Sequence, residues 1–309
     1  MSRLPIIFDC DPGGDDALML LMAFVSNSFD ILGITTVAGN VSIDHVTNNA
    51  LRLIELAKRH DVQVYAGCPR PILKPPIFAS NIHGESGLDG SAMPPPMTKA
   101  QPMHAVDFII TTLLNSERKV TLSLSGPMTN LAVALVKAPS IAAKVQEVIC
   151  MGGSTGKGNI TPYAEFNFFV DPHAAHIVLS SGIPIRMIGL NVTHEVFLTE
   201  EDFRKLDSMN TAVSREVSSI LRFGAKSYRD LGFEGRVIHD ACIVAALLRP
   251  EHFSFSKSKV YIEHKDDLRM GQSIVEEWQA DSDSHIAVAV TVDKDAVLAL
   301  VMELLRSYS

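Results

Sequence analysis

The sequence predicts a single α/β domain with a mostly parallel central sheet flanked by helices, in a Rossmann-like arrangement. Three observations indicate this fold class. Apolar, β-branched runs alternate with longer segments whose apolar residues follow helical spacing. Glycine or polar residues come directly after most of the apolar runs, where strand-to-helix turns are expected. No repeat, low-complexity segment or linker divides residues 1–309, a length that one domain can accommodate.

Strands and helices alternate through the first two thirds of the chain. Leu4–Phe8 is apolar and predicts a buried strand, and Gly14–Val25 is apolar enough for a buried helix. Asp44–Arg59 carries its apolar residues at helical spacing and predicts a second helix. Further strands are expected at Ile31–Val37, Val62–Tyr65, Val120–Ser125, Val145–Met151 and Ile183–Leu190. Further helices are expected at Ala105–Leu114, Thr129–Lys137 and Pro172–Ser181.

Residues Cys68–Met103 interrupt the alternation with eight prolines and a glycine-rich stretch that contains His83. Long loops in compact domains are often functional, so we expect this one to reach over a site. After Thr199 the pattern becomes helical, most clearly at Ala212–Tyr228 and His239–Leu248. Three short strands and a closing helix are expected at Val260–Glu263, Ser273–Glu276, Ile286–Val292 and Asp293–Leu305.

The composition narrows the class of partner. The net charge is −8 and there is no run of Lys or Arg, which argues against a nucleic-acid polymer or an anionic membrane. The four cysteines are scattered without a zinc-binding spacing, as in a cytosolic protein with reduced thiols. The apolar stretch before Asp9 is too short for a signal peptide, and no run approaches the ~20 residues of a membrane helix. We therefore expect a cytoplasmic protein that binds a small molecule.

Four carboxylates lie where the first strand meets the first helix: Asp9, Asp11, Asp15 and Asp16. Asp9 and Asp11 point to the same side of a strand, and Asp11 and Asp15 are four residues apart at a helix start. Pro12 suits the first helical position, and Gly13 and Gly14 allow a close approach of the backbone. Helix capping accounts for one or two of these acids at about 0.3–1 kcal/mol each. A hard cation such as Ca²⁺ or Mg²⁺ accounts better for all four.

Other polar groups follow the predicted strands, at Asn40, at Ser125–Asn130 and at Met151–Ser154. The segment Gly158–Asn167 contributes two amides and one carboxylate, which suit the hydroxyls of a sugar but also occur in polar surface loops. His239-Asp240 precedes an apolar helix. This pair is either a helix cap with a chance neighbour or a metal oxygen beside a proton donor.

These motifs together resemble the nucleoside hydrolases of the inosine–uridine-preferring type. The resemblance starts with the Asp-x-Asp-Pro-Gly-x-Asp-Asp pattern of Asp9–Asp16 and spans residues 6 to about 248 in the right order. The matching motifs are Asp9–Asp16, Val37–Asn40, His83–Leu88, Gly126–Asn130, Met151–Gly153, Asn159–Asn167 and His239-Asp240. The resemblance implies the fold of that family and hydrolysis of the N-glycosidic bond of ribonucleosides such as uridine, cytidine or inosine.

The resemblance also implies roles for individual residues. A Ca²⁺ ion would be held by Asp11, Asp15, Asp16, Asp240 and the main-chain carbonyl of Ser125. The positions that match ribose contacts and the pocket lining are Asp15, Asn40, Met151, Asn159, Glu165, Phe166, Asn167 and Asp240. Asp11 matches the base that takes a proton from the metal-bound water. His239 matches the acid that protonates the leaving base, and His83 lies on a loop near that base.

Several features leave alternatives open. Tyr228 either supplies a hydroxyl near the base or is an ordinary amphipathic-helix tyrosine. Cys10, Gly14 and Asn191 depart from the usual family residues; we expect Cys10 to pack, and Gly14 replaces a bulkier residue. The only tryptophan, Trp278, is far from every motif, which argues against the tryptophan stacking of purine-specific relatives. A homodimer or homotetramer is expected, as is usual among relatives.

Two other functions fit parts of the pattern. A Mg²⁺-dependent phosphohydrolase would use Asp9 as nucleophile and Asp11 as acid, but it needs a well-placed Lys and a later acidic pair that are not evident. A non-catalytic nucleoside or ribose binding protein would keep the amides but would not need Asp11 or His239 to titrate.

Overall fold

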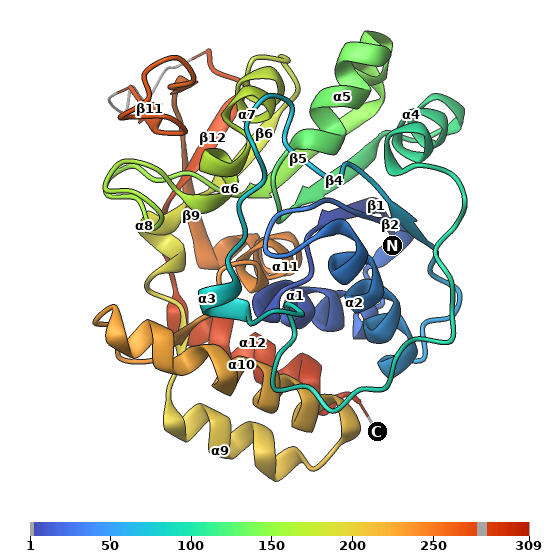
Figure 1. The fold of residues 1–309 in the computed structure, drawn as a ribbon, viewed down its shortest axis with the longest axis vertical. Coiled ribbons are helices and arrows are strands. Elements are labelled where there is room, and N and C mark those ends of the chain that lie inside the picture. Colours follow the sequence, from blue (N-terminus) through green and yellow to red (C-terminus); the bar gives the residue numbers. More distant parts are fainter. Residues whose placement is uncertain (1–2, 277–282, 309) are drawn as a thin grey trace.

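The computed structural model describes residues 3–276 and 283–308. Eight strands form one central sheet (Figure 1). From edge to edge they are β3 (Val64–Ala66), β2 (Phe29–Thr36), β1 (Leu4–Cys10), β4 (Val120–Leu124), β5 (Val145–Met151), β6 (Ile185–Ile188), β12 (Ile286–Val292) and β9 (Phe253–Lys257). All neighbouring strands are parallel except the β12–β9 pair at one edge. This confirms the predicted α/β domain with a mostly parallel sheet.

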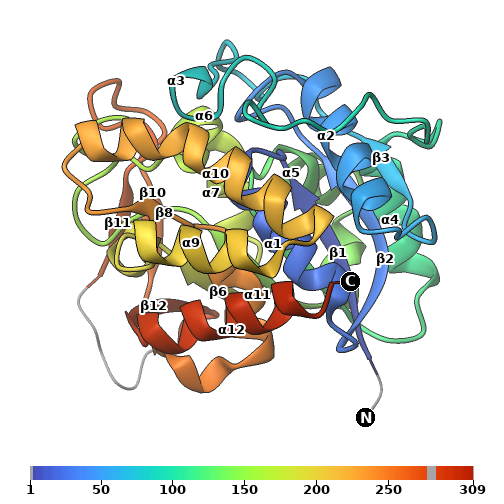
Figure 2. The same ribbon diagram turned by 90° about the horizontal axis from the view of Figure 1, so that it is seen from below.

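Helices cover both faces of the sheet (Figures 1 and 2). In β1, Ile6 and Phe8 pack on one face and Ile7 on the other, because strand side chains alternate. The first face is covered by α1 (Gly14–Val25), α2 (Ile43–Leu56), α9 (Glu200–Met209), α10 (Ala212–Asp230), α11 (Ala241–Leu248) and α12 (Lys294–Arg306). The second face is covered by α4 (Ala105–Asn115), α5 (Thr129–Lys137) and α7 (Pro172–Leu179).

Smaller elements complete the part of the chain that the structure describes. Two antiparallel pairs lie apart from the central sheet, β7 (Phe197–Leu198) with β8 (Arg236–Val237) and β10 (Val260–Ile262) with β11 (Ser273–Val275). The short helices are α3 (Ser80–His83), α6 (Phe166–Val170), α8 (Leu190–Thr193) and the 3₁₀ turns Pro139–Lys144 and Pro250–His252. Among the described residues, no helix is both long and apolar enough to cross a membrane.

Some expected boundaries are wrong for local reasons. α1 begins at Gly14 with Gly13 as its N-cap. Pro12 therefore lies outside the helix rather than at its first position. α11 begins at Ala241, because Asp240 has already taken the N-cap position. Strand β9 was not predicted, since its sequence Phe-Ser-Phe-Ser-Lys exposes one side at the sheet edge and carries little apolar signal. Trp278 lies outside the described residues.

The strand order places one crevice at the centre of the sheet. The chain adds strands outward from β1 to β3 on one side and from β4 to β6 on the other, so the strand order reverses between β1 and β4. Ligands of such sheets bind at the carboxyl ends of the strands beside this point. β1 ends at Cys10 and β4 at Leu124, so Asp11 and Ser125 are the first residues beyond the two central strands. The acidic cluster of the sequence therefore lies at the topological switch point.

The loop between β3 and α4 extends over this end of the sheet and carries α3 (Figure 1). Hydrogen bonds attach it to α10. The Ser227 hydroxyl donates to the Asn81 carbonyl at 2.9 Å, and the Ser91 hydroxyl donates to Glu216 at 2.8 Å. The loop thus brings His83 to the crevice, as expected from its sequence. A movement of the loop on ligand binding stays a prediction.

Candidate active site

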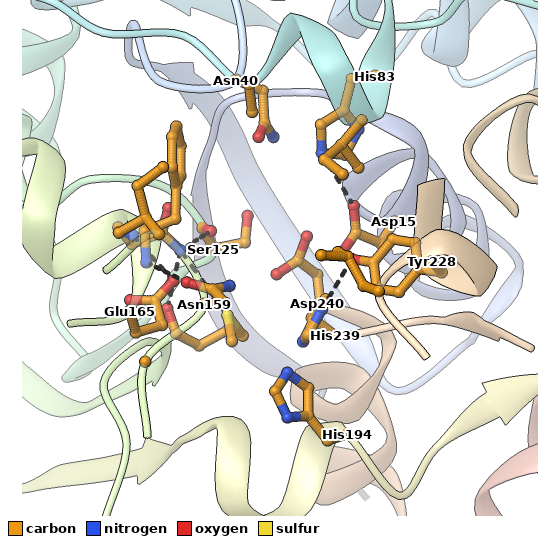
Figure 3. Close-up of a pocket in the computed structure, with 18 of the residues that line it drawn as sticks. Asp15, Asn40, His83, Ser125, Asn159, Glu165, His194, Tyr228, His239 and Asp240 are labelled. Carbon is orange, nitrogen blue, oxygen red and sulfur yellow. Dashed lines mark hydrogen bonds and ion pairs between the residues drawn. The ribbon is translucent and has the colours of Figure 1, made fainter. Parts of the chain in front are cut away.

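A cavity of about 340 Å³ opens at the carboxyl ends of the central strands (Figure 3). Most residues singled out in the sequence line it: Asp15, Asn40, His83, Ser125, Met151, Asn159, Glu165, Phe166, Asn167, Tyr228, His239 and Asp240. Asp11 and Asp16 are fully buried and do not line the cavity. The chain segments that supply these groups are far apart in the sequence, so the fold assembles one site from them.

Three carboxylates meet in the crevice. Ligand oxygens of Asp15, Asp16 and Asp240 all lie within 4.8 Å of one another, and within the described ranges this is the one group of acidic, His or Cys side chains close enough to share a metal ion. Asp240 occupies the N-cap of α11, yet its side chain accepts no capping hydrogen bond. Burial and then the charges of Asp15 and Asp16 raise the pKa of Asp240 well above its usual range. The capping explanation thus fails for Asp240, and a bound cation would relieve the repulsion.

Asp16 connects this group to the protein around it. Its carboxylate accepts hydrogen bonds from the Ser125 hydroxyl at 2.7 Å, from the Gly13 amide at 3.0 Å and from the Asn40 side chain at 3.1 Å. Burial and the neighbouring Asp15 raise the pKa of Asp16 to about 6 despite these donors. Asp16 therefore both caps α1 and faces the acidic group.

Asp11 lies in a narrow space between two turns. A Cβ atom on Gly39 would be 2.1 Å from Asp11 Oδ2, and one on Gly126 would be 2.7 Å from Oδ1, so only glycine leaves room for this carboxylate. Oδ2 accepts a hydrogen bond from the Asn40 amide at 2.7 Å. Oδ1 is buried and has no hydrogen-bond partner in the part of the chain that the structure describes. Burial and then Asp16 raise the pKa of Asp11 well above its usual range. Such an orphaned oxygen fits a site that takes up a cation or a proton.

Two basic side chains flank Asp15 on its other side. Arg236 Nη2 lies 3.7 Å and His83 Nε2 lies 4.0 Å from Asp15 Oδ1. Burial alone would raise the pKa of Asp15, but Arg236, His83 and His239 hold it below its usual value. His83 Nδ1 accepts a hydrogen bond from the Gly14 amide at 3.1 Å, which places the ring proton on Nε2 in the neutral form. Burial lowers the pKa of His83 to about 4, so this ring holds α1 and Asp15 in place as a neutral imidazole.

A hydrogen-bonded chain lies beside Asp15 and Asp240 in the cavity (Figure 3). The Tyr228 hydroxyl is 2.9 Å from His239 Nε2, and the Thr193 hydroxyl is 2.8 Å from His239 Nδ1. Burial lowers the pKa of His239 to about 3 and raises the pKa of Tyr228 to about 12. Both groups are therefore neutral at pH 7, and the tyrosine hydroxyl can act as a proton donor in the cavity. The position of Tyr228 favours a functional role over that of an ordinary helix tyrosine.

Amide and carboxylate groups form another part of the cavity lining. Glu165 accepts hydrogen bonds from the amides of Asn167 and Gly153, and the Asn167 side chain donates to the Ser125 carbonyl at 2.7 Å. Asn159 Oδ1 accepts from the Phe166 amide at 2.9 Å. These bonds leave further polar atoms at the cavity surface, as a ligand rich in hydroxyl groups requires.

Glu165 predicts a pH dependence of stability. Burial raises its pKa to about 7 against three or more amide donors, so the folded state holds the proton more tightly than the unfolded chain. The stabilisation of the folded state by protonated Glu165 is fully present below the pKa of an unfolded glutamate, and it is lost as the pH rises through about 7. In urea titrations without divalent ions, the free energy of unfolding of wild type should fall relative to that of Glu165→Gln between about pH 5 and about pH 8. A constant difference between the two would contradict this assignment.

Several residues of the site had no signal in the sequence. Arg236 looks like an ordinary charged residue between two helices, but it is 1% exposed and lies behind Asp15. His194 and Phe233 line the cavity beside His239, with ring centroids of His194 4.8 Å from Phe233 and 5.5 Å from His239. His194 directly follows Gly189–Thr193, the segment that contains Asn191, and it could have been found from that position. Nothing in the sequence marks Phe233.

The departures from the family pattern lie outside the acidic group. The thiol of Cys10 is buried in the core, which agrees with the expected packing role. The Asn191 side chain donates to the Ala289 carbonyl at 2.8 Å and so connects α8 to β12.

Asp9 Oδ1 accepts hydrogen bonds from Asn130 at 2.7 Å and from Thr35. Asp9 does not line the cavity, so it is not placed to attack a substrate there.

Known proteins share both the sequence and the fold. The sequence model described as inosine-uridine preferring nucleoside hydrolase matches residues 6–299. The chain belongs to this family. Pyrimidine-specific ribonucleoside hydrolase RihA of Shewanella woodyi is 39% identical over 100% of both chains. An uncharacterised protein of Schizosaccharomyces pombe is 43% identical over 97% of this nucleoside hydrolase and 98% of its own length.

Solved structures agree with this assignment. A plant nucleoside hydrolase, PpNRh1, superposes on the chain with a TM-score of 0.92 at 30% identity, over 98% of this chain and 99% of that one. The purine-preferring ribonucleoside hydrolase of Gardnerella vaginalis gives a TM-score of 0.92 at 30% identity over 98% of both chains. The predicted family and enzyme class are thus confirmed, and the cavity described above is the candidate active site of a nucleoside hydrolase.

Proposed function

We propose that this nucleoside hydrolase cleaves the N-glycosidic bond of ribonucleosides with water, releasing the free base and ribose, and that it requires Ca²⁺. One observation supports this most directly. A buried group of carboxylates and a neutral Tyr228–His239 pair lie beside each other at a single cavity. Bond cleavage makes the ribose resemble an oxocarbenium ion, which the carboxylates stabilise, while the departing base needs a proton from a neighbouring donor.

The acidic group has the chemistry of a calcium site. Asp15, Asp16 and Asp240, together with Asp11 and the Ser125 carbonyl, supply only oxygen ligands, which hard cations prefer. A Ca²⁺ ion bound there would orient the ribose hydroxyls and make the attacking water more acidic. Asp11 Oδ1 is buried and has no hydrogen-bond partner among the described residues. It can therefore accept the proton that the attacking water loses when the water oxygen bonds to the ribose.

The ribose is recognised by the amides and carboxylates around the acidic group. Asn40 lies next to Asp11 and Asp16, whereas Asn159 and Glu165 lie near Ser125 (Figure 3), and the Asn167 side chain donates to the Ser125 carbonyl. Phe166 and Met151 add apolar contacts at the same level of the cavity. This distribution fits a sugar, whose hydroxyls each donate and accept one hydrogen bond and whose carbon skeleton needs an apolar surface.

The base leaves towards Tyr228 and His239. We expect pyrimidine ribonucleosides to be good substrates, since the relatives named RihA, 39–40% identical over the whole chain, are described as pyrimidine-specific. Inosine is the next candidate, as the family description includes it. A panel of uridine, cytidine, inosine and adenosine, assayed for free base and reducing sugar, tests this ranking.

Removal of the Tyr228 hydroxyl should affect substrates unequally. Tyr228→Phe keeps the ring and its packing but removes the atom 2.9 Å from His239 Nε2. We expect kcat for uridine to fall by about 10²-fold, the lower end of general-acid effects, and kcat for inosine to fall less, because a purine has more acceptor sites for other donors. Steady-state kinetics on both nucleosides measures this. Equal losses on the two would contradict proton donation by the Tyr228–His239 pair.

A homodimer or homotetramer stays our prediction for the assembly, and light scattering coupled to size exclusion measures it. The family match argues against the non-catalytic nucleoside-binding alternative, since a protein of that kind would bind uridine but release no base. The phosphohydrolase alternative loses its nucleophile, because the carboxylate of Asp9 is held by Asn130 and Thr35 behind the cavity.

A further inference from the structure

Arg236 is the largest fully buried side chain in the described structure, at 1% exposed. It extends from β8 into the space between the start of α1 and α10. A buried guanidinium is costly unless a counter-charge and hydrogen bonds compensate for its lost hydration. The position of Arg236 therefore needs an explanation, which neither the fold nor the cavity lining supplies.

The contacts of Arg236 lead to both halves of the candidate active site. Nη2 pairs with Asp15 Oδ1 at 3.7 Å, Nη1 donates to the Val237 carbonyl at 2.9 Å, and Cζ lies 4.4 Å from the centroid of the Tyr228 ring. Asp15 belongs to the acidic group, and Tyr228 holds His239. One permanently charged side chain thus contacts both the acidic group and the Tyr228–His239 pair.

Two glycines leave the space that this side chain fills. A Cβ on Gly224 would lie 3.1 Å from Arg236 Nε. A Cβ on Gly14 would lie 3.3 Å from Ile220 Cγ2, 3.4 Å from Leu221 Cδ2 and 3.5 Å from Arg236 Nη2, so three side chains surround this space. Gly14 is not among the glycines with positive φ, so its backbone would accept another residue. Side-chain space, and not backbone conformation, therefore accounts for glycine at position 14.

We propose that Arg236 is a positioning residue that fixes Asp15 and Tyr228 relative to each other, and that it fills, together with Ile220 and Leu221, the side-chain space beside Gly14. The inference rests on the proposed function for its effect on catalysis. It assigns a role to a residue outside the cavity lining and couples two positions that are far apart in the sequence.

The first test compares three arginine variants in base release from uridine. Arg236→Met keeps most of the length but loses the charge and the planar group, and kcat/KM should fall by about 10–100-fold, mainly in kcat, as is typical of groups that orient ligands. Arg236→Lys restores the charge and should recover part of the loss. The matched control is Arg222→Met on α10, since Arg222 also pairs with acids and stacks on an aromatic ring, at 4.5 Å from Phe203. It should keep wild-type kcat/KM.

The second test is a double-mutant cycle read by thermal unfolding, which needs no activity. Gly14→Val should lower the melting temperature of wild type, because the valine competes for space with Arg236, Ile220 and Leu221. In the Arg236→Ala background the same change should lower the melting temperature less, because one of the three neighbours is gone, so the two effects are not additive. Gly156→Val is the control for a valine without neighbours, since nothing lies within 4 Å of a Cβ on Gly156.

The outcomes separate this inference from the proposed function. If wild type releases no base from any nucleoside, the proposed function fails, and the thermal cycle alone decides whether the Gly14–Arg236 pairing holds. If wild type is active, Arg236→Met with unchanged kcat/KM, or Arg236→Lys no better than Arg236→Met, overturns the positioning role. Additive melting-temperature changes in the cycle overturn the pairing even where Arg236→Met fails to fold.

Discussion

Asp11→Asn is expected to reduce kcat for uridine hydrolysis by about 10³–10⁴-fold, near the upper end of general-base effects. One buried oxygen of the Asp11 side chain has no hydrogen-bond partner among the described residues, and the glycines at positions 39 and 126 leave just enough space for this carboxylate. Asparagine has nearly the same shape but accepts no proton from water at neutral pH. Steady-state kinetics of base release measures the loss. The melting temperature separates loss of chemistry from loss of fold.

A surface acid provides the matched control for Asp11→Asn. Asp107 lies on α4, on the opposite face of the sheet, and its carboxylate pairs with Lys137 at the surface. Asp107→Asn should therefore keep wild-type kcat within about twofold, because exposed ion pairs contribute little. If Asp11→Asn kept comparable turnover, another group would have to take the proton from the attacking water.

Removal of divalent ions is expected to have the second largest effect. Treatment with a calcium chelator should abolish base release, and added Ca²⁺ should restore it, because the carboxylates of the acidic group would then be left to repel one another. Binding at about 100 times Kd should also stabilise the protein by about 2.7 kcal/mol, visible as a higher melting temperature. A chelated protein that keeps full activity would contradict a catalytic metal.

The apparent Ca²⁺ affinity should depend on pH with a defined sign. Burial raises the pKa of Asp16 to about 6 and raises the pKa values of Asp11 and Asp240 well above their usual range. Protons therefore compete with the metal, and the affinity should fall as the pH is lowered through about 6. Calorimetric titrations in two buffers of different ionisation enthalpy measure the protons released. Binding without proton release would contradict these pKa shifts.

Much of the site follows from the sequence because its parts are local. The Asp9–Asp16 pattern lies at the end of one apolar strand, and any parallel sheet of this order places that end at the switch point. Asn40, Met151 and His239 each follow or precede a clear apolar segment, which locates them at the same edge. The family resemblance then assigns roles that spacing alone leaves open.

The rest of the site depends on packing between segments that are distant in the sequence. Arg236 approaches Asp15 only because β8 and α1 meet in three dimensions, and no periodicity marks that meeting. The Tyr228–His239 hydrogen bond forms because Tyr228 on α10 lies beside the residues that precede α11. No pattern in the sequence predicts this contact. For Asp9 and Asp11, which are two residues apart, the neighbours Asn130 and Asn40 come from distant segments, and each donates a hydrogen bond to one oxygen of the carboxylate beside it.

The measurement that tests the central claim most directly is the release of free base and ribose from uridine by the wild-type protein, with Ca²⁺ present and phosphate absent. The proposed function predicts equal amounts of uracil and reducing sugar, with loss of both after chelation. No release from any ribonucleoside of the panel, or a requirement for phosphate with formation of a sugar phosphate, would contradict it.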